Sequence, residues 1–254
     1  MIRFASLGSG SKGNALLVES GRTRVLVDCG FGPREMARRL ESKGVAPESI
    51  AAVLVTHEHA DHVGGAARCA ARFGWTVHAS YGTAAAAGQL ADVTVRRFDS
   101  HAAFAIGDLE IHPYPVPHDA REPTQFVFSD GAKRLGVLTD AGTVTPHIAA
   151  MLAECAALVL ECNHDAQMLA RGRYPPPLKQ RIAGGFGHLE NDAAAGLLRG
   201  IGGKSLQHVV AAHLSEENNT PALARAALAG ALGCGAEWIG VASQVEGFGW
   251  RELR

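Results

Sequence analysis

The sequence predicts an α/β fold in which two mixed sheets pack together and helices flank them. Short apolar runs rich in β-branched residues alternate with helical patterns along the chain. A series of strands followed by a helix occurs in the first half and returns in the second, without a linker or an internal repeat between them. We therefore expect residues 1–254 to form a single domain of two sheets with helices outside them.

The composition indicates a globular chain with a large core. Of the 254 residues, 47% are hydrophobic and 19% are charged, which argues against disorder. The formal net charge is −1, so a polyanion would need a local basic patch. The five cysteines are scattered without CxxC spacing, which is typical of reduced thiols. No apolar run reaches the roughly 20 residues of a membrane span, and the N-terminus does not resemble a signal peptide, so we expect a cytoplasmic protein with no membrane partner.

The first half should contain most of one sheet and its helices. The expected strands are residues 2–7, 15–19, 22–27, 51–55, 76–79, 93–98 and 104–106, and the expected helices are 33–43, 61–73 and 82–90. The helix from Pro33 is the clearest, because proline suits the first helical turn and Gly44 suits the end.

The second half should contain the other sheet. The expected strands are residues 109–119, 124–129, 134–139, 157–160, 208–212 and 237–242, and the expected helices are 146–155, one ending near 172, 192–199 and 221–229. Asp130-Gly131 predicts a hairpin turn. The prolines within residues 109–119 predict an edge strand or a strand end.

The stretch Thr56-His57-Glu58-His59-Ala60-Asp61-His62 directly follows a buried strand. His57 and His59 are two apart, so both point the same way in extended chain. Asp61 and His62 follow at a helix start, where they can face a second point in space. This pattern suits two neighbouring metal ions. The alternative is a polar loop in which Asp61 caps the helix, but three histidines and an aspartate at this spacing argue against it.

Further residues of ligand type follow other strands. They are Asp28, His118, Asp140 and His213. We assign His57, His59 and His118 to one ion, Asp61, His62 and His213 to the other, and Asp140 as a bridge between them. Asp28 is either a turn former or a partner that orients a ligating histidine. Oxygen and imidazole donors without cysteine suit two divalent ions, zinc or manganese.

Two such ions can share a hydroxide that attacks phosphorus in a phosphodiester. Asp61 could also orient that hydroxide, and His188 or His164 could donate a proton to, or hold, the departing or terminal phosphate. The loop from Gly8 to Asn14 is either a plain hairpin turn or a loop that brings Ser11 and Asn14 to a substrate oxygen.

Residues 171–181 carry four basic residues and no acid. They form either a solvated proline loop or a site for an anionic backbone, in which Arg173 and Lys179 would contact the substrate.

The order Asp28, His57-x-His59-x-Asp61-His62, His118, Asp140 and His213 resembles the metallo-β-lactamase fold superfamily over nearly the whole chain. The resemblance implies an αββα sandwich. The aspartate at position 140 resembles the residue that the phosphodiesterase and nuclease branches have there, whereas true lactamases place a cysteine at that position. Only 73 residues separate Asp140 from His213, too few for the extra nuclease domain of the RNase J and Artemis branch.

Finer motifs resemble the YycJ (WalJ) family. They are residues 7–14, 161–165, 174–175, 178–179, 187–191 and 213–219, with Glu190 where that family has serine. The resemblance implies a 5'-to-3' exonuclease on double-stranded DNA, linked to mismatch repair, with duplex ends as its partner. Within residues 161–165, Asn163 is expected to contact substrate.

Two other functions remain open on the sequence. One is a small-molecule cyclic phosphodiesterase of the phosphoribosyl cyclic phosphate type, or another hydrolase of this fold, using the same site. The other is a metal-holding module that clamps DNA ends without cutting. Open coordination positions in the ligand set favour an enzyme over such a module.

Overall fold

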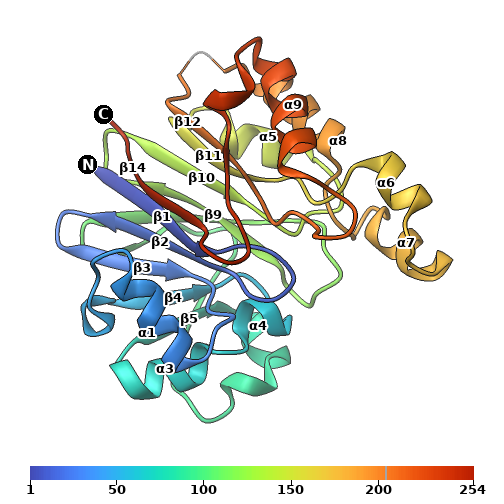
Figure 1. Ribbon diagram of the computed structural model, residues 1–254. Coiled ribbons are helices and arrows are strands. Elements are labelled where there is room, and N and C mark those ends of the chain that lie inside the picture. The colour runs from blue at the N-terminus through green and yellow to red at the C-terminus, as the bar shows by residue number, and fades with distance from the viewer. Residues whose placement is uncertain (204) are drawn as a thin grey trace.

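The computed structural model of the protein describes residues 1–203 and 205–254 as two seven-stranded sheets between two layers of helices (Figure 1). In spatial order, the first sheet contains β14 (Phe248–Glu252), β1 (Ile2–Gly8), β2 (Ala15–Ser20), β3 (Thr23–Val27), β4 (Ala52–Val55), β5 (Thr76–Ser80) and β6 (Val95–Phe98). The second contains β13 (Gly240–Val241), β12 (His208–Ala212), β11 (Ala157–Glu161), β10 (Arg134–Leu138), β9 (Thr124–Ser129), β8 (Leu109–Pro115) and β7 (Phe104–Ile106).

Both sheets are mixed, as expected. Neighbouring strands from β1 to β3 pair antiparallel and those from β3 to β6 pair parallel. In the second sheet, strands from β7 to β10 pair antiparallel and those from β10 to β13 pair parallel. Parallel strands end at the same edge of a sheet, so residues that follow β3, β4, β10, β11 and β12 are brought toward one another.

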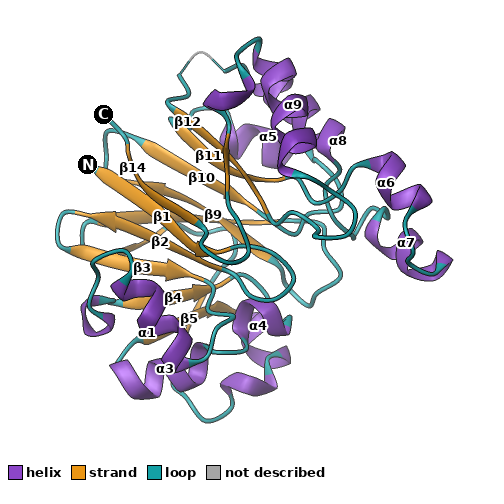
Figure 2. Cartoon of the chain, in the orientation of Figure 1, coloured by secondary structure: helices purple, strands orange, loops and turns teal. Residues whose placement is uncertain are grey.

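The period-2 pattern of the strands divides the apolar side chains between layers. In β4, Ala52 and Leu54 join the core between the two sheets, while Val53 and Val55 face the helices. The helices α1 (Pro33–Glu41), α2 (Ala60–Val63), α3 (Ala66–Phe73) and α4 (Tyr81–Ala86) lie beside the first sheet (Figure 2). The helices α5 (Pro146–Leu152), α8 (Asn191–Ile201) and α9 (Pro221–Leu232) cover the second. This confirms the αββα architecture.

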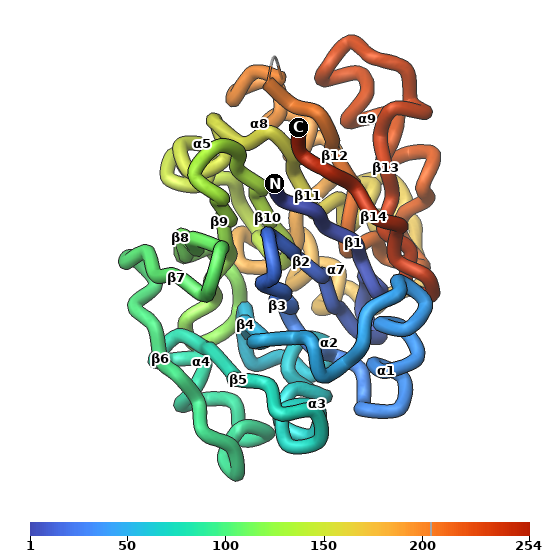
Figure 3. Tube along the Cα trace, turned by 90° about the vertical axis from the view of Figure 1, so that its left-hand side faces the viewer, coloured from blue at the N-terminus to red at the C-terminus, as the bar shows by residue number. Residues whose placement is uncertain are grey.

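Two further helices, α6 (Ala166–Arg171) and α7 (Pro176–Ile182), project from one end of the sandwich, at the right of Figure 1. Three short 3-10 turns, η1 (Pro47–Ser49), η2 (Gly88–Leu90) and η3 (Ala236–Trp238), complete the elements found in the described residues. The chain ends lie side by side (Figure 3), where Leu253 N donates to Ile2 O at 2.9 Å.

Several expected elements are wrong in their bounds. The helix expected over residues 61–73 is broken at Gly64 and Gly65, because Gly65 N donates to Cys29 O and a Cβ at Gly65 would meet Phe31 O at 1.8 Å. The helix expected over residues 82–90 is split between α4 and η2, and the closing strand over residues 237–242 is reduced to Gly240–Val241. The strand β14 was not expected from the sequence.

The basic proline segment is also not a simple loop. Pro176 opens α7, where its missing N–H costs nothing in the first turn, so Lys179 and Arg181 lie on a helix. The prolines of β8 fit their prediction, since β7 pairs with Leu109–Ile111 and, among the described residues, no strand pairs with Pro113 and Pro115 on that side. In the described parts of the chain, no helix combines the length and apolarity that crossing a membrane requires.

Candidate metal centre

The strand ends of both sheets deliver the predicted ligand residues to one place. Asp28 follows β3, His57 lies just beyond β4, Asp140 just beyond β10, and His213 directly follows β12. His118 comes from the loop after β8 and completes a group with His57 and His59 whose donor atoms all lie within 4.8 Å of one another. Asp61, His62 and His213 form a second group by the same measure.

The Asp140 carboxylate lies between the two groups. Its Oδ2 is 3.2 Å from His62 Nε2, and its Oδ1 is 3.5 Å from His213 Nε2 and 4.0 Å from His118 Nε2. The predicted ligands thus form a continuous cluster with a carboxylate at its centre, as the bridging role of Asp140 requires.

The backbone conformation at the strand ends directs these side chains toward the cluster. Asp28, Asp140 and His213 have φ values of 64°, 51° and 53°, and they are the non-glycine residues with left-handed backbone in the described chain. Non-glycine residues adopt this conformation uncommonly, although aspartate and histidine do so more often than most, and such residues gather at functional sites. Three strained strand ends that meet at one cluster are therefore a structural signature of the site.

Asp28 acts on the cluster through its neighbours. Its buried carboxylate accepts from Thr56 N at 2.8 Å and from Thr56 Oγ1, and it lies 2.7 Å from His62 Nδ1. A proton on Nδ1 leaves Nε2 of His62 as the lone-pair nitrogen that faces Asp61 and Asp140. The position fits the predicted role of Asp28 as a partner that orients a ligating histidine.

The cluster also has the electrostatics of a cation site. His57 Nε2, His213 Nε2 and Asp140 Oδ2 are buried and have no hydrogen-bond partner among the described residues. Burial, reinforced by neighbouring histidines, holds the pKa of His57 well below its usual value, so its ring is neutral. The pKa of the Asp140 carboxyl lies far below its usual range, because the surrounding histidines outweigh the opposing effect of burial. The neutral imidazole of His57 and the ionised carboxylate of Asp140, each with an unsatisfied buried atom, fit a divalent metal ion.

Glu161 is a functional candidate that the sequence reasoning did not assign. This fully buried last residue of β11 accepts from Ala141 N at 2.8 Å, and its Oε1 lies 2.8 Å from His188 Nδ1 and 3.7 Å from His213 Nδ1. Burial opposes charge on His188, but the carboxylates of Glu161 and Asp140 raise the pKa of His188 to about 9. The acidic end of an apolar strand was the signal that could have revealed it.

The predicted substrate residues are distributed unevenly around the centre. Asn14 Nδ2 lies 3.2 Å from Asp61 Oδ2 and 3.1 Å from His62 Nε2, so this amide contacts the ligand cluster itself. Asn163 Nδ2 donates to His213 O at 3.0 Å, which places it against the cluster as well. Ser11, by contrast, is exposed on the glycine-rich loop.

A pocket of about 370 Å³ adjoins the metal centre between α6, α7 and α8. It shares His188 with the cluster, and His164, Lys179, Gln180 and Glu190 also line it. Lys179 Nζ donates to Ala170 O at 2.8 Å, and Arg173 is exposed on the segment between α6 and α7. The pocket offers space for part of a molecule bound at the metal centre.

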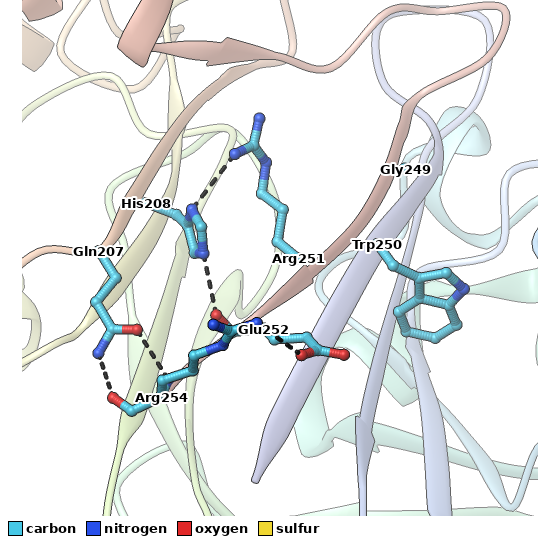
Figure 4. A pocket seen from close by; sticks show the side chains of 7 residues that line it. All are labelled: Gln207, His208, Gly249, Trp250, Arg251, Glu252 and Arg254. Atoms are coloured by element: carbon cyan, nitrogen blue, oxygen red, sulfur yellow. Dashed lines mark hydrogen bonds and ion pairs between the residues drawn. The ribbon is translucent and has the colours of Figure 1, made fainter.

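A larger hollow of about 690 Å³ lies elsewhere, against β14 and the start of β12 (Figure 4). There His208 Nε2 faces Glu252 O at 3.0 Å, and Arg251 lies 3.3 Å from the other ring nitrogen (Figure 4). None of the candidate ligands lines it. His208 begins β12 and His213 directly follows the other end of that strand, so this hollow is at the opposite end of the sheet. Size alone therefore does not identify the reactive site.

Comparison with known proteins agrees with the fold and the cluster. The sequence model of the beta-lactamase superfamily domain matches residues 23–213. The exodeoxyribonuclease WalJ of Streptococcus pneumoniae is 32% identical over 229 residues, which cover 87% of this chain and 85% of that protein. The exodeoxyribonuclease YycJ of Bacillus anthracis is 33% identical over 230 residues, which cover 88% of this chain and 86% of that protein.

A solved structure shares the whole fold. The metallo-beta-lactamase fold protein YhfI from Bacillus subtilis superposes with a TM-score of 0.77 at 16% identity and covers 99% of both chains. Together with the sequence matches, this places the chain in the metallo-β-lactamase superfamily of metal-dependent hydrolases, within the family of the WalJ and YycJ proteins.

Proposed function

We propose that this protein is a two-metal exonuclease that removes nucleotides from the 5' ends of double-stranded DNA. The buried donor cluster around Asp140 carries the proposal, because it occurs in a chain related over most of its length to two exodeoxyribonucleases. We further propose that the whole chain, residues 1–254, works as one domain, and that its activity serves mismatch repair in the cytoplasm.

We propose that the donor groups hold two ions in adjacent positions. His57, His59 and His118 would hold one ion; Asp61, His62 and His213 would hold the other; and the Asp140 carboxylate would contact both. Zinc or manganese fits this mixture of imidazole and carboxylate donors. When bound, two such ions activate water at neutral pH and neutralise the charge of a phosphodiester.

The residues around the ions would position the substrate and move a proton. Asp61 lies at the edge of the cluster, where its carboxylate can orient a water molecule. His188 is held through Nδ1 by Glu161, which leaves Nε2 free to donate a proton to the departing oxygen. His164 lines the same pocket and is the alternative donor, or a contact for a terminal phosphate.

The nucleic acid would extend from this centre across the neighbouring polar surface. Arg173 and Lys179 on the projecting segment supply positive charge for phosphates, and Ser11 is exposed for a substrate oxygen. Asn14 and Asn163 would act close to the reacting phosphate, since both already touch candidate ligands. His188 joins the pocket to the ions and would contact the same phosphate.

The test uses duplex DNA labelled at either the 5' or the 3' end, incubated with the purified protein and Zn²⁺ or Mn²⁺, together with metal analysis. We expect two ions per chain and stepwise release of nucleotides from the 5' end. No cleavage with either metal would overturn the nuclease proposal. Turnover of a cyclic phosphodiester without DNA cleavage would instead identify a small-molecule phosphodiesterase, and DNA binding without product would identify an end clamp.

A further inference from the structure

The loop before His188 presents an apolar ring to solvent. Residues 184–188 read Gly-Gly-Phe-Gly-His, and the Phe186 side chain is 65% exposed. A single exposed apolar residue is ordinary on a protein surface. Phe186 differs because its backbone is tied directly to the metal centre.

Every backbone carbonyl from residue 184 to residue 187 accepts a hydrogen bond. The donors are Gly187 N to Gly184 O at 2.8 Å, Thr143 Oγ1 to Gly185 O at 3.2 Å, Asp119 N to Phe186 O at 3.0 Å and His118 Nδ1 to Gly187 O at 2.9 Å. The loop also packs so closely that a Cβ at Gly142 would come within 2.4 Å of its backbone. The backbone that carries the exposed ring is therefore held firmly by hydrogen bonds and close packing.

The backbone of this loop contacts the candidate metal centre immediately after Phe186. Gly187 O fixes the ring of His118, and Phe186 O binds the residue that follows His118. His188, two positions after Phe186, lies 3.4 Å from Asp140 Oδ1. A group that stacks on Phe186 would thus be attached within a short distance of the reacting phosphate.

An arginine also lies near this position. Arg181 donates to Asp119 Oδ2 at 2.6 Å, and Asp119 N in turn donates to Phe186 O, so the guanidinium is held next to the loop that carries Phe186. An exposed aromatic face with a guanidinium nearby matches single-stranded nucleic acid, in which bases stack while phosphates are held by charge.

We propose that Phe186 is a stacking platform for the nucleobase adjoining the scissile phosphate, in a chain end that has separated from its partner strand. This inference rests on the proposed nuclease function and names the part of the substrate that the site recognises. Stacking accepts any base because every base has a π-face, so the contact would hold the chain end without selecting sequence.

The test compares wild type, Phe186→Ala and Phe186→Trp on a DNA oligonucleotide and on bis(p-nitrophenyl) phosphate, which contains no nucleobase. Trp238→Ala is the matched control, because this 38% exposed aromatic residue lies in η3, outside the metal centre. We expect Phe186→Ala to lower kcat/KM on DNA relative to bis(p-nitrophenyl) phosphate by about 10-fold, mainly through KM, and Phe186→Trp to restore the ratio.

A second substrate isolates the base contact. DNA that carries an abasic residue next to the scissile phosphate should be cut about equally well, relative to bis(p-nitrophenyl) phosphate, by wild type and Phe186→Ala. The stacking inference would be overturned if Phe186→Ala lost equal kcat/KM on DNA and on bis(p-nitrophenyl) phosphate, or if wild type and Phe186→Ala still differed on abasic DNA. In either case, DNA cleavage by wild type would leave the nuclease proposal standing. Absence of DNA cleavage by wild type would overturn the proposed function itself.

Discussion

Replacing Asp28 with asparagine should weaken metal binding without disturbing the backbone. Asparagine tolerates the left-handed φ of 64° at this position, and its Oδ1 can still accept from Thr56 N. Its amide nitrogen, however, would face His62 Nδ1 across 2.7 Å, where two donors cannot coexist. The His62 proton would therefore move to Nε2, the atom that faces Asp61 and Asp140.

The magnitude follows from the loss of one oriented ligand. Removal of such a partner costs about 10–100-fold in metal affinity, or roughly 1.4–2.7 kcal/mol. Competition with a chromophoric chelator measures this affinity for each ion. Asp108→Asn is the control. Asp108 also accepts from a backbone N–H, that of Arg22, and from a threonine hydroxyl, that of Thr23, but it lies in a hairpin turn away from the metal centre. Equal affinity of Asp28→Asn and wild type would refute the tautomer argument, as would an equal loss in Asp108→Asn.

Three other changes test separate parts of the molecule. Asp140→Ala should reduce phosphodiester turnover by about 100-fold or more in steady-state assays, because the central carboxylate is lost. Arg173→Ala should weaken DNA binding and reduce the slope of log affinity against log salt by about 0.9, as fluorescence anisotropy can measure. Burial and Arg96 lower the pKa of His78 to about 4, so the unfolded chain takes up the proton first and stability should fall as pH drops from 6.5 toward 4. Urea unfolding at pH 7 and pH 5 measures this loss of stability. His78→Phe, which keeps an aromatic ring to stack on Phe104, should show a smaller difference in unfolding free energy between the two pH values than wild type.

The convergence of the strand ends was predictable from the sequence because parallel strands share one carboxyl edge. Asp28, Asp140 and His213 each follow a short apolar run, and this position together with their ligand-type side chains brought them into the predicted set. The same rule applied to β11 would have selected Glu161. Its partners depend on register, since Glu161 pairs with Ala212 in the parallel ladder and thus lies level with the residue before His213.

Other features depend on contacts that no local pattern contains. The break between α2 and α3 follows from the close approach of Gly65 to Cys29 and Phe31, which are more than thirty positions away. The strand β14 exists because the chain end returns to pair with β1, where Phe248 packs on Phe4. The contacts of Asn14 with Asp61 and His62 are equally invisible, because they require two loops to meet across the site.

The left-handed residues explain how a rigid sandwich can aim ligands from so many strands. A strand that continued in extended conformation would send its next side chain to the opposite face of the sheet. A left-handed residue at the strand end turns the chain, so the side chain can point along the sheet edge toward the cluster. Each such residue costs about 1–3 kcal/mol, and three of them, Asp28, Asp140 and His213, are buried here. Glycine would relieve that strain but has no side-chain donor atom. The strain is best explained by the ions that Asp140 and His213 can bind and by the His62 ring that Asp28 holds.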